Sequence, residues 1–588
     1  MGAIAPYLAV DVAHHPRCGG RAARVLDSQP GDGGLVGDER GVAERVAASK
    51  DEGGRMKDEA YWLWLFMATA GVGVAVAYDH GQAWAKFGIL LGGVFLYYAL
   101  AALSVRRLDG VMAGGTAVAL LIAFYFLFTV DWQTWTADFA LLTALGKRVG
   151  AALSSLGWPA LHPNKAAGLM AMFVPMGTAV LWRNWRQKRW GGAVLSGTAV
   201  AVTLFALLLT SSRGAWGALL VSALFVMGCF FWLRAMGRET AVSLHVKLVG
   251  IIGGAVSLAI FAWVMWQSLH SMTSSVTRLQ LYRQTWQLIA DFPFTGSGLA
   301  TFNGLYSQYI RVIPFFFFNY GHNLYLDVWL TQGPLALLAL LVIYGGSVWR
   351  ALALLREEAT AVRFALLGGL LVILLHGLID DALYGFLGTP LLFAFPGMVA
   401  GLSAHHLLVK ENRRWTAVRR YALPVLAVML VVLFASKEVR ARWFANLGAV
   451  TLAQGQLAGW PPNSWDYDIP AANLEKARQQ SLQALDLDAG DVTAQYRLGM
   501  MALYEQDFAE AARYLQAAHE ARPTHRGIRK MLGYSLAWGG RTAVAADMLR
   551  SIPEAAQELA NYRSWWRQQG RDDLASRAEQ VYGLLVKP

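Results

Sequence analysis

Apolar residues in this chain occur in long, nearly uninterrupted runs rather than at alternating positions. From Tyr61 onward the runs are roughly twenty residues long, the length that a helix needs to cross a hydrocarbon layer about 30 Å thick. The pattern predicts eleven membrane-spanning helices, at residues 61–78, 84–103, 111–130, 166–182, 191–210, 215–233, 248–267, 324–349, 364–379, 385–407 and 421–436. We therefore expect an all-α fold, with a polytopic transmembrane helical bundle followed by a soluble α-helical repeat domain.

The polar parts of the chain divide it into domains. Residues 1–55 are rich in Gly, Arg, Asp and Ala and show no apolar period, which favours a disordered segment or a wrongly assigned start codon. We assign residues 56–437 to the transmembrane domain, with a large outer loop at 268–323. Residues 438–464 are interpreted as a linker and residues 465–588 as the repeat domain.

The last domain shows a pattern typical of tetratricopeptide repeats, in which small residues let two antiparallel helices approach and a proline closes the unit. One repeat is carried by Leu498, Gly499, Phe508, Ala511, Leu515, Ala518 and Pro523. The family's period of about 34 residues recurs at Leu532, Gly533 and Ala545, and partly at Ala477 and Ala484. We predict two complete repeats and one partial repeat, serving as a scaffold or as a surface that contacts substrate.

Composition and charge support a membrane protein. The chain of 588 residues is 56% hydrophobic and 15% charged, which is too apolar for a soluble protein of several domains. Its net charge of +12 does not indicate nucleic-acid binding, because the basic residues cluster in alternate connections between spans, as expected of cytoplasmic loops. These connections carry Arg106 and Arg107; Arg183, Arg186, Lys188 and Arg189; Arg234, Arg238 and Lys247; Arg350, Arg356 and Arg363; and Lys410, Arg413, Arg414, Arg419 and Arg420. The other connections and the repeat domain are then predicted to lie outside the cytoplasm.

Cysteine and histidine usage gives little evidence of redox or metal chemistry. Cys18 and Cys229 are too few for a disulfide framework or a thiolate metal site. No acidic cluster of the kind that a carboxylate metal site needs is evident, since Asp380 and Asp381 are adjacent and their side chains would diverge on a helix. We expect no metal and no cofactor.

One arginine stands out in the outer connections. The stretch TSSRGAWG places Arg213 in a short turn between two uncharged spans, close to the membrane surface. A guanidinium at this depth costs a few kcal/mol unless it is paired or meets water. Arg213 therefore either reaches the lipid headgroups or forms an anion site, and the tight Ser-Ser-Arg-Gly turn favours the anion site.

The outer loop contains a second candidate for anion binding. Residues 277–298 read as an amphipathic helix that ends in a Pro and Gly turn, with Arg278 at its start and Arg283 on its polar side. Its apolar stripe, which could lie on the membrane, is formed by Leu279, Tyr282, Trp286 and Ile289. Either arginine could be ordinary surface charge, but a second fixed arginine near Arg213 would suit the paired charges of a diphosphate.

His322 and Asn323 interrupt an apolar stretch, FFFFNYGHNLYLDVWLTQG, where a span is predicted to begin. A neutral imidazole at this boundary can accept a proton near physiological pH, and Asn323 can cap the following helix while its amide donates a hydrogen bond. The alternative for His322 is an interfacial, hydrogen-bonded residue.

Taken together, these motifs resemble the O-antigen ligase and polymerase superfamily over about residues 61–407. The ligase signature begins at His322 and Asn323 and continues to Gly333 after nine residues; its last position departs, since Ala336 stands there, which leaves the polymerases open. The other landmarks are HPN at His162 to Asn164, SSRG around Arg213, the Arg278 helix ending in PFTGSG, and LIDDALYG at residues 378–385.

The resemblance implies a reaction and a set of site residues. Such enzymes transfer a glycan from a polyprenyl diphosphate carrier to an acceptor hydroxyl at the outer face of the bacterial inner membrane, without nucleotide or metal. Arg213 and Arg278 would bind the leaving diphosphate, and His322 would act as the general base of an inverting transfer. The remaining residues carried over, as contacts to substrate, are Arg283, Asn323, His162, Asn164, Asp380 and Asp381.

Several functions remain open from the sequence. The acceptor could be the lipid A core of lipopolysaccharide, a growing glycan in a polymerase, or Ser and Thr in a protein O-oligosaccharyltransferase, and the repeat domain favours a protein partner or a large assembly. A glycolipid transporter or flippase is the non-enzyme alternative. Against it, the ionisable residues cluster at the outer ends of spans rather than at the bilayer midplane.

Overall fold

The computed structural model describes residues 61–586 with internal gaps. The gaps are residues 104, 138, 153–155, 237–252, 254–255, 257–258, 261, 264, 268–269, 271, 274–275, 311–319, 386–387, 407–412 and 461–468. The predicted disordered segment or false start at 1–55 and most of the predicted span at 248–267 lie outside the described residues.

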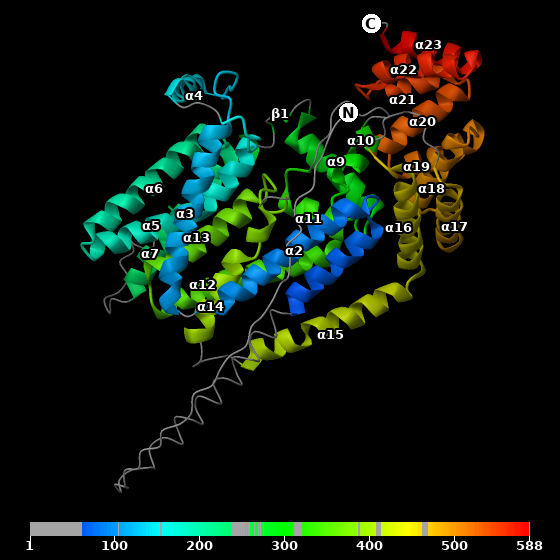
Figure 1. Ribbon diagram of the computed structural model, residues 1–588. Helices are drawn as coiled ribbons and strands as arrows, with labels where there is room; N and C mark the ends of the chain where they lie inside the picture. Colours follow the sequence, from blue (N-terminus) through cyan, green and yellow to red (C-terminus); the bar gives the residue numbers. More distant parts are fainter. Residues whose placement is uncertain are drawn as a thin grey trace, which may run out of the picture. The chain divides into compact units, whose positions relative to one another are not determined.

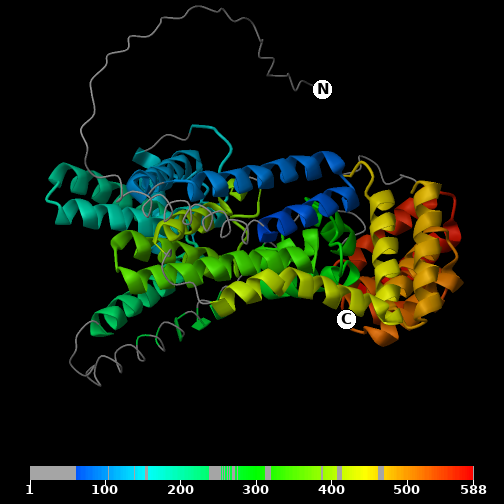
Figure 2. The same ribbon diagram turned by 90° about the horizontal axis from the view of Figure 1, so that it is seen from below.

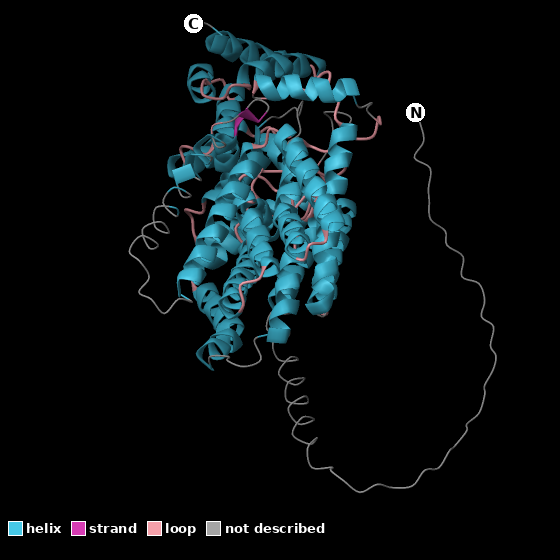
Figure 3. Cartoon of the chain, turned by 90° about the vertical axis from the view of Figure 1, so that its left-hand side faces the viewer, coloured by secondary structure: helices cyan, strands magenta, loops and turns pink. Residues whose placement is uncertain are grey.

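Nearly all regular structure in the described ranges is helical, as Figure 3 shows. The exception is a pair of two-residue antiparallel strands, β1 (Met272–Thr273) and β2 (Val276–Thr277), in which Met272 faces Thr277. The strand pair leads directly into α9. Apart from it, the all-α prediction is confirmed.

Six of the described helices are long and apolar enough to cross a membrane, by length and composition. They are α2 (His80–Ala101), α3 (Val105–Thr129), α5 (Pro163–Arg186), α6 (Trp190–Leu209), α7 (Arg213–Met236) and α12 (Pro334–Glu357). Shorter apolar helices are Tyr61–Val76, α13 (Ala361–His376), a segment over Thr389–Ser403 that comprises the 3-10 turn η1 (Thr389–Leu391) and most of α14 (Ala394–His406), and the end of α15 (Arg413–Ala435). Ten of the eleven predicted runs thus correspond to six helices of spanning length and four shorter ones, and the run at 248–267 lies mostly outside the described residues.

The predicted continuous span at 324–349 is wrong in one respect, because the chain breaks at Gly333. A short helix, α11 (Leu324–Gln332), ends there, and Pro334 starts α12. Gly333 has φ 84°, and a Cβ at this position would collide with the carbonyl oxygen of Phe294. Hydropathy averaged over the run did not show this break, although Gln332, Gly333 and Pro334 mark it in the sequence.

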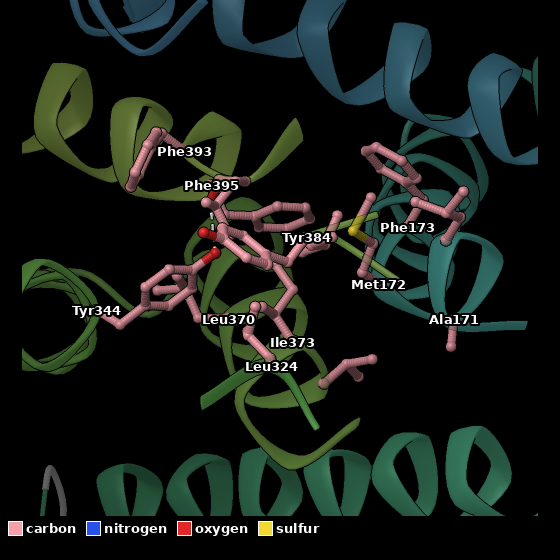
Figure 4. Close-up of a cluster of buried hydrophobic side chains, with 14 of the residues drawn as sticks. Ala171, Met172, Phe173, Leu324, Tyr344, Leu370, Ile373, Tyr384, Phe393 and Phe395 are labelled. Carbon is pink, nitrogen blue, oxygen red and sulfur yellow. Dashed lines mark hydrogen bonds between the residues drawn. The ribbon is translucent and has the colours of Figure 1, made fainter. Parts of the chain in front are cut away.

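The core of the bundle forms where α5, α12, α13 and the start of α14 meet (Figure 4). The Tyr344 hydroxyl on α12 donates to the Leu392 carbonyl at 2.5 Å, and the rings of Phe173 and Phe395 lie 5.8 Å apart. Gly369 on α13 faces the Phe395 ring so closely that a Cβ would clash. Small residues at such crossings allow helices in a membrane to pack tightly.

The loops between the spans and the C-terminal region contain the remaining helices. The loops carry α4 (Ala140–Ala152), α9 (Arg278–Asp291) and α10 (Phe302–Ile310). After α15 follow α16 (Lys437–Gln456), α17 (Ala471–Leu487), α18 (Val492–Tyr504), α19 (Phe508–Ala521), α20 (Arg526–Trp538), α21 (Thr542–Leu549), α22 (Ala555–Gln568) and α23 (Asp572–Val586). Residues 438–464, interpreted from the sequence as a linker, thus include most of α16, which packs against α17 (Figure 1).

The predicted repeat appears as a recurring contact between paired helices. A Cβ on Gly499 of α18 would lie 2.5 Å from Leu515 of α19, and one on Gly533 of α20 would lie 2.6 Å from Leu549 of α21. Both members of the second pair stand about 34 residues after those of the first. The small residue at the crossing therefore has the role that the sequence pattern predicted.

The C-terminal region is joined to the outer loop by buried polar contacts. α15 leads from the bundle to α16 (Figure 2), and the Asn446 amide of α16 donates to the Thr295 hydroxyl at 2.9 Å. The buried Asp291 carboxylate, at the end of α9, accepts a hydrogen bond from Arg497 of α18 at 3.0 Å. A charge-assisted contact of this kind orients α9 against the repeat helices.

Candidate functional site

His322 lies directly before α11 in an unusual backbone conformation. Its φ is 53°, a left-handed value that few residues other than glycine adopt. Asn323 follows as the N-cap, and its Oδ1 accepts from the backbone N–H groups of Tyr325 and Leu326 at 3.0 Å each. The predicted cap is confirmed, and the Asn323 amide also donates to the Leu378 carbonyl at 3.0 Å.

Asp380 is the polar partner of His322. The Nδ1 atom of His322 lies 3.3 Å from Oδ2 of Asp380, and the two residues are only 5% and 1% exposed. A carboxylate beside Nδ1 favours the tautomer that carries its proton there, which leaves Nε2 free to accept one. Burial raises the pKa of Asp380, but the hydrogen bond and charge of His322, with the charge of Arg278, hold it below its usual value.

Tyr282 fixes this arrangement from the outer loop. Its hydroxyl donates to the His322 carbonyl at 2.7 Å and lies 3.1 Å from the Leu378 carbonyl, so it joins the two segments that carry the pair. Burial raises the pKa of Tyr282, so the hydroxyl remains a donor. Tyr282 stands on α9, whose start is closed by a capping box between Thr277 and Gln280.

Arg278 and His162 complete the surroundings of the pair. Arg278 is buried at the start of α9, and its charge acts on Asp380, Tyr282 and His162. The His162 ring, just before α5, has its centroid 6.3 Å from that of His322. Loss of solvation lowers the pKa of His162, Asp380 opposes the shift, and Arg278 adds to it. Four of the residues selected from the sequence thus come together here: His322, Asp380, Arg278 and His162.

Arg213 lies on the segment that packs beside Asp380. It is the first residue of α7, and the next residue, Gly214, is so close to Ile379 that a Cβ would lie 2.8 Å from the Ile379 side chain. The preceding Ser211 has φ 56°, as the tight Ser-Ser-Arg-Gly turn requires. Asn164 stands in the first turn of α5, two residues after His162.

Arg283 lies elsewhere. It is exposed and lines a cleft between α9 and the repeat helices, together with Arg526 and Arg529. The buried face of α9 carries mainly residues outside the predicted stripe, namely Arg278, Leu281, Thr285 and Leu288. Of the stripe, Ile289 is buried and Trp286 is exposed. The buried face includes the polar residues Arg278 and Thr285, so the pattern of apolar residues alone does not predict that it is buried.

Asp381 lines a cavity next to the pair, whereas His322 and Asp380 do not line it. The cavity has a volume of about 330 Å³, and its charged lining residues are Lys86, Lys165, Asp327 and Asp381. One carboxylate oxygen each of Asp327 and Asp381 is buried without a hydrogen-bond partner among the described residues. Burial raises the pKa of Asp381 well above its usual value, the Asp327 charge adds to this, and Lys165 opposes it.

Asp380 and Asp381 diverge as predicted, but not on a helix. They lie in the connection after α13, where the Asp381 N–H donates to Oδ1 of Asp380 at 2.7 Å. In the described part of the chain, no group of three or more His, Cys, Asp or Glu side chains could hold a metal ion.

Sequence reasoning missed the lysines, Asp327 and the role of Tyr282. Lys86 and Asp327 each stand alone in an apolar run, and an ionisable residue in such a run is a signal of function. Lys86 is buried, with Nζ 3.1 Å from the Thr389 hydroxyl and 4.2 Å from the centre of the Tyr384 ring. Neither contact could be predicted, because the partners are about 300 residues away.

The fold and site define a multi-span membrane protein whose buried histidine, carboxylate and arginine meet at the ends of its helices. Residues 198–341 match the family model described as O-antigen ligase. The chain is thus a multi-span membrane protein with an O-antigen ligase family domain, which includes Arg213, Arg278, Arg283, His322 and Asn323. This family implies a glycosyltransferase with a lipid-linked glycan substrate. No curated protein and no solved structure matches the chain.

Proposed function

We propose that this protein transfers a glycan from a polyprenyl diphosphate carrier to an acceptor hydroxyl at the outer face of the bacterial cytoplasmic membrane. The observation that carries the proposal is the buried His322–Asp380 pair, with Arg278 close enough to act on its charge. A base and a cation next to each other fit a transfer in which one oxygen loses a proton while another departs as an anion.

The chemistry assigns one role to each partner. Nε2 of His322 takes the proton of the acceptor hydroxyl as its oxygen forms the new bond to the anomeric carbon. The bond from that carbon to the diphosphate oxygen breaks, and the diphosphate leaves with the electron pair, inverting the centre. Asp380 holds the ring through Nδ1 and stabilises the imidazolium that forms, while it remains ionised.

Arg213 and Arg278 are assigned to the leaving diphosphate. Planar guanidinium groups can each contact two phosphate oxygens, and neither group loses its charge at working pH. Arg278 is held in place before substrate binds, because it is buried on a capped helix. Preorganised charge of this kind lowers the barrier without rearrangement during the reaction.

The cavity beside the pair is assigned to the transferred or accepting sugar. Asp381 provides a buried oxygen without a partner in the described structure, and Lys165 provides a cation on the same wall. Together with Asn303 and the Tyr320 ring, these groups can bind hydroxyls and cover the face of a sugar. His162, Asn164 and Asn323 do not line this cavity and are assigned to further contacts with substrate.

The test uses the purified full-length protein in vesicles, with an undecaprenyl diphosphate-linked oligosaccharide and no nucleotide, metal or ion gradient. We expect glycan on the acceptor and an equal amount of free undecaprenyl diphosphate. Lengthening of one donor by another would identify a polymerase. Movement of intact donor across the vesicle without cleavage would refute the proposal in favour of a transporter. A reporter fused after Pro588 should be active only outside the cytoplasm.

A further inference from the structure

A large cleft separates α9 from the repeat helices α20 to α22. Its volume is about 900 Å³, and its walls come from one face of α9, from Leu326 of α11, and from the segments around Thr524 and Ser551. The two walls touch at one edge, where the Gln287 amide donates to the Thr524 carbonyl at 3.1 Å. The cleft is thus a joint feature of the membrane domain and the C-terminal region.

Among the described residues that line the cleft, arginine is the only charged type, at positions 283, 526 and 529. The charge of Arg526 is balanced by an ion pair with Glu554. Arg529 instead donates to the neutral Ser551 hydroxyl at 2.6 Å and the Pro523 carbonyl at 2.8 Å, and Arg283 is exposed. Two guanidinium charges therefore face the cleft without a carboxylate among its lining residues, which favours an anionic ligand.

The uncharged lining residues suit a saccharide. Gln280, Gln284 and Gln287 place amide groups along one face of α9, and Trp286 between them is 51% exposed. The Trp286 ring is held by an edge contact with Trp329, whose centroid lies 5.1 Å away. The amide oxygens of Gln280 and Gln284 already accept from Thr277 and Tyr306, so these side chains contribute N–H donors to sugar hydroxyls, and an indole face covers the apolar side of a sugar ring.

The cleft is connected to the proposed catalytic pair by Tyr282. This residue lines the cleft, and its hydroxyl donates to the His322 carbonyl at 2.7 Å. Arg278 and Arg283 are on the same helix but have different environments, since Arg278 is buried beside Asp380 and Arg283 faces the cleft. The helix therefore places one arginine near His322 and Asp380 and another in the cleft beside the repeat helices.

We propose that this cleft binds an acidic saccharide chain, bearing carboxylate or phosphate groups, as the acceptor that is presented to His322. The role of this saccharide as the acceptor rests on the function proposed above, whereas its binding to the cleft does not. An acidic protein segment is the other candidate. The three glutamines and the exposed indole favour the saccharide, and the cleft lies at helix ends and connections rather than along a row of repeat helices.

Binding can be measured without turnover. The full-length protein in detergent is titrated calorimetrically with oligogalacturonate, with a neutral malto-oligosaccharide of equal length, and with an oligoglutamate peptide of equal length. We expect oligogalacturonate to bind at least about tenfold more tightly than either of the others, with an affinity that falls as salt is added. Replacing both Arg283→Gln and Arg529→Gln should remove this preference.

Arg513→Gln is the matched control, because Arg513 is an exposed arginine of the repeat helices that pairs with Glu510 and does not line the cleft. It should bind as the parent does, and all variants should show the parent's thermal unfolding. Equal affinity for the neutral chain, unchanged binding by the double variant, or tighter binding of oligoglutamate would each overturn the inference. His322→Ala should still bind oligogalacturonate. Binding by this variant is thus a separate result from the loss of transfer that tests the catalytic proposal.

Discussion

Two buried groups of charged side chains, one in the membrane domain and one in the repeat helices, differ in how their hydrogen bonds are used. In the repeat helices Lys530 donates to Glu558 at 2.8 Å and to Glu554 at 3.3 Å. The Tyr534 hydroxyl donates to the second Glu558 oxygen. The charges in this group pair with one another, as a buried structural network requires.

The group around His322 and Asp381 is incomplete by the same measure. One oxygen of Asp381, one oxygen of Asp327 and Nε2 of His376 are buried without a hydrogen-bond partner in the described part of the chain. Asp327 and Asp381 line the cavity of about 330 Å³, which offers room for partners of their two oxygens. Buried polar atoms rarely remain unpaired unless a ligand or water satisfies them. The comparison therefore separates a network whose hydrogen bonds are complete from one that leaves polar atoms available to a ligand or water.

The largest expected effect is on turnover at the incomplete group. His322→Ala should lower transfer by roughly a hundredfold to ten-thousandfold, since a positioned general base contributes about this much. Donor binding and thermal unfolding should remain close to the parent's. The measurement is transfer at saturating donor and acceptor, beside a binding titration with the donor.

His270→Ala provides the control, because His270 is an exposed histidine of the same outer loop. Its variant should transfer at the parent's rate. Near-parental transfer by a well-folded His322→Ala would remove the base from the mechanism and leave His322 as a structural residue.

Mutation of the paired group around Lys530 should lower stability rather than turnover. Lys530→Met leaves Glu554 and Glu558 close together without their buried cation, and breaking such a group costs about 3–5 kcal/mol of stability. We expect a clear fall in the unfolding temperature of the C-terminal region, measured calorimetrically on the full-length protein, while transfer per folded molecule changes little. A stable Lys530→Met protein with impaired transfer would contradict the structural assignment of this group.

The smallest effect concerns the arginines that we assign to the diphosphate. Arg213→Ala and Arg278→Ala should each lower transfer by at least about tenfold, because each loses a charge-assisted contact of roughly 1.5–3 kcal/mol. Lysine should restore only part of the rate, since it lacks the planar fork. The measurement is initial transfer rate against donor concentration. Full activity of Arg278→Lys together with an inactive Arg283→Ala would show that the wrong arginine of α9 was chosen.

The sequence predicted the class of the fold and selected several residues that the structure brings together. Runs of apolar residues located the helices, and the order of the motifs drew attention to Arg278, His322 and Asp380. The pairing of His322 with Asp380 was not predicted, because the two residues are 58 positions apart and hydropathy carries no information on contacts across the bundle. Arg283 was grouped with Arg278 by its position in the sequence, although the helix turns its side chain toward the repeat helices.

The sequence by itself determined those features that arise from local spacing: helices long enough to cross a membrane, the Asn323 cap, and the small residues at Gly499 and Gly533. These follow from helix geometry and from the size of single side chains. Only the tertiary structure decided which polar groups meet, because that depends on how distant segments pack. Gly333 breaks a span that hydropathy would continue, Tyr282 joins the His322 and Leu378 segments, and α9 separates the buried arginine from the arginine of the cleft.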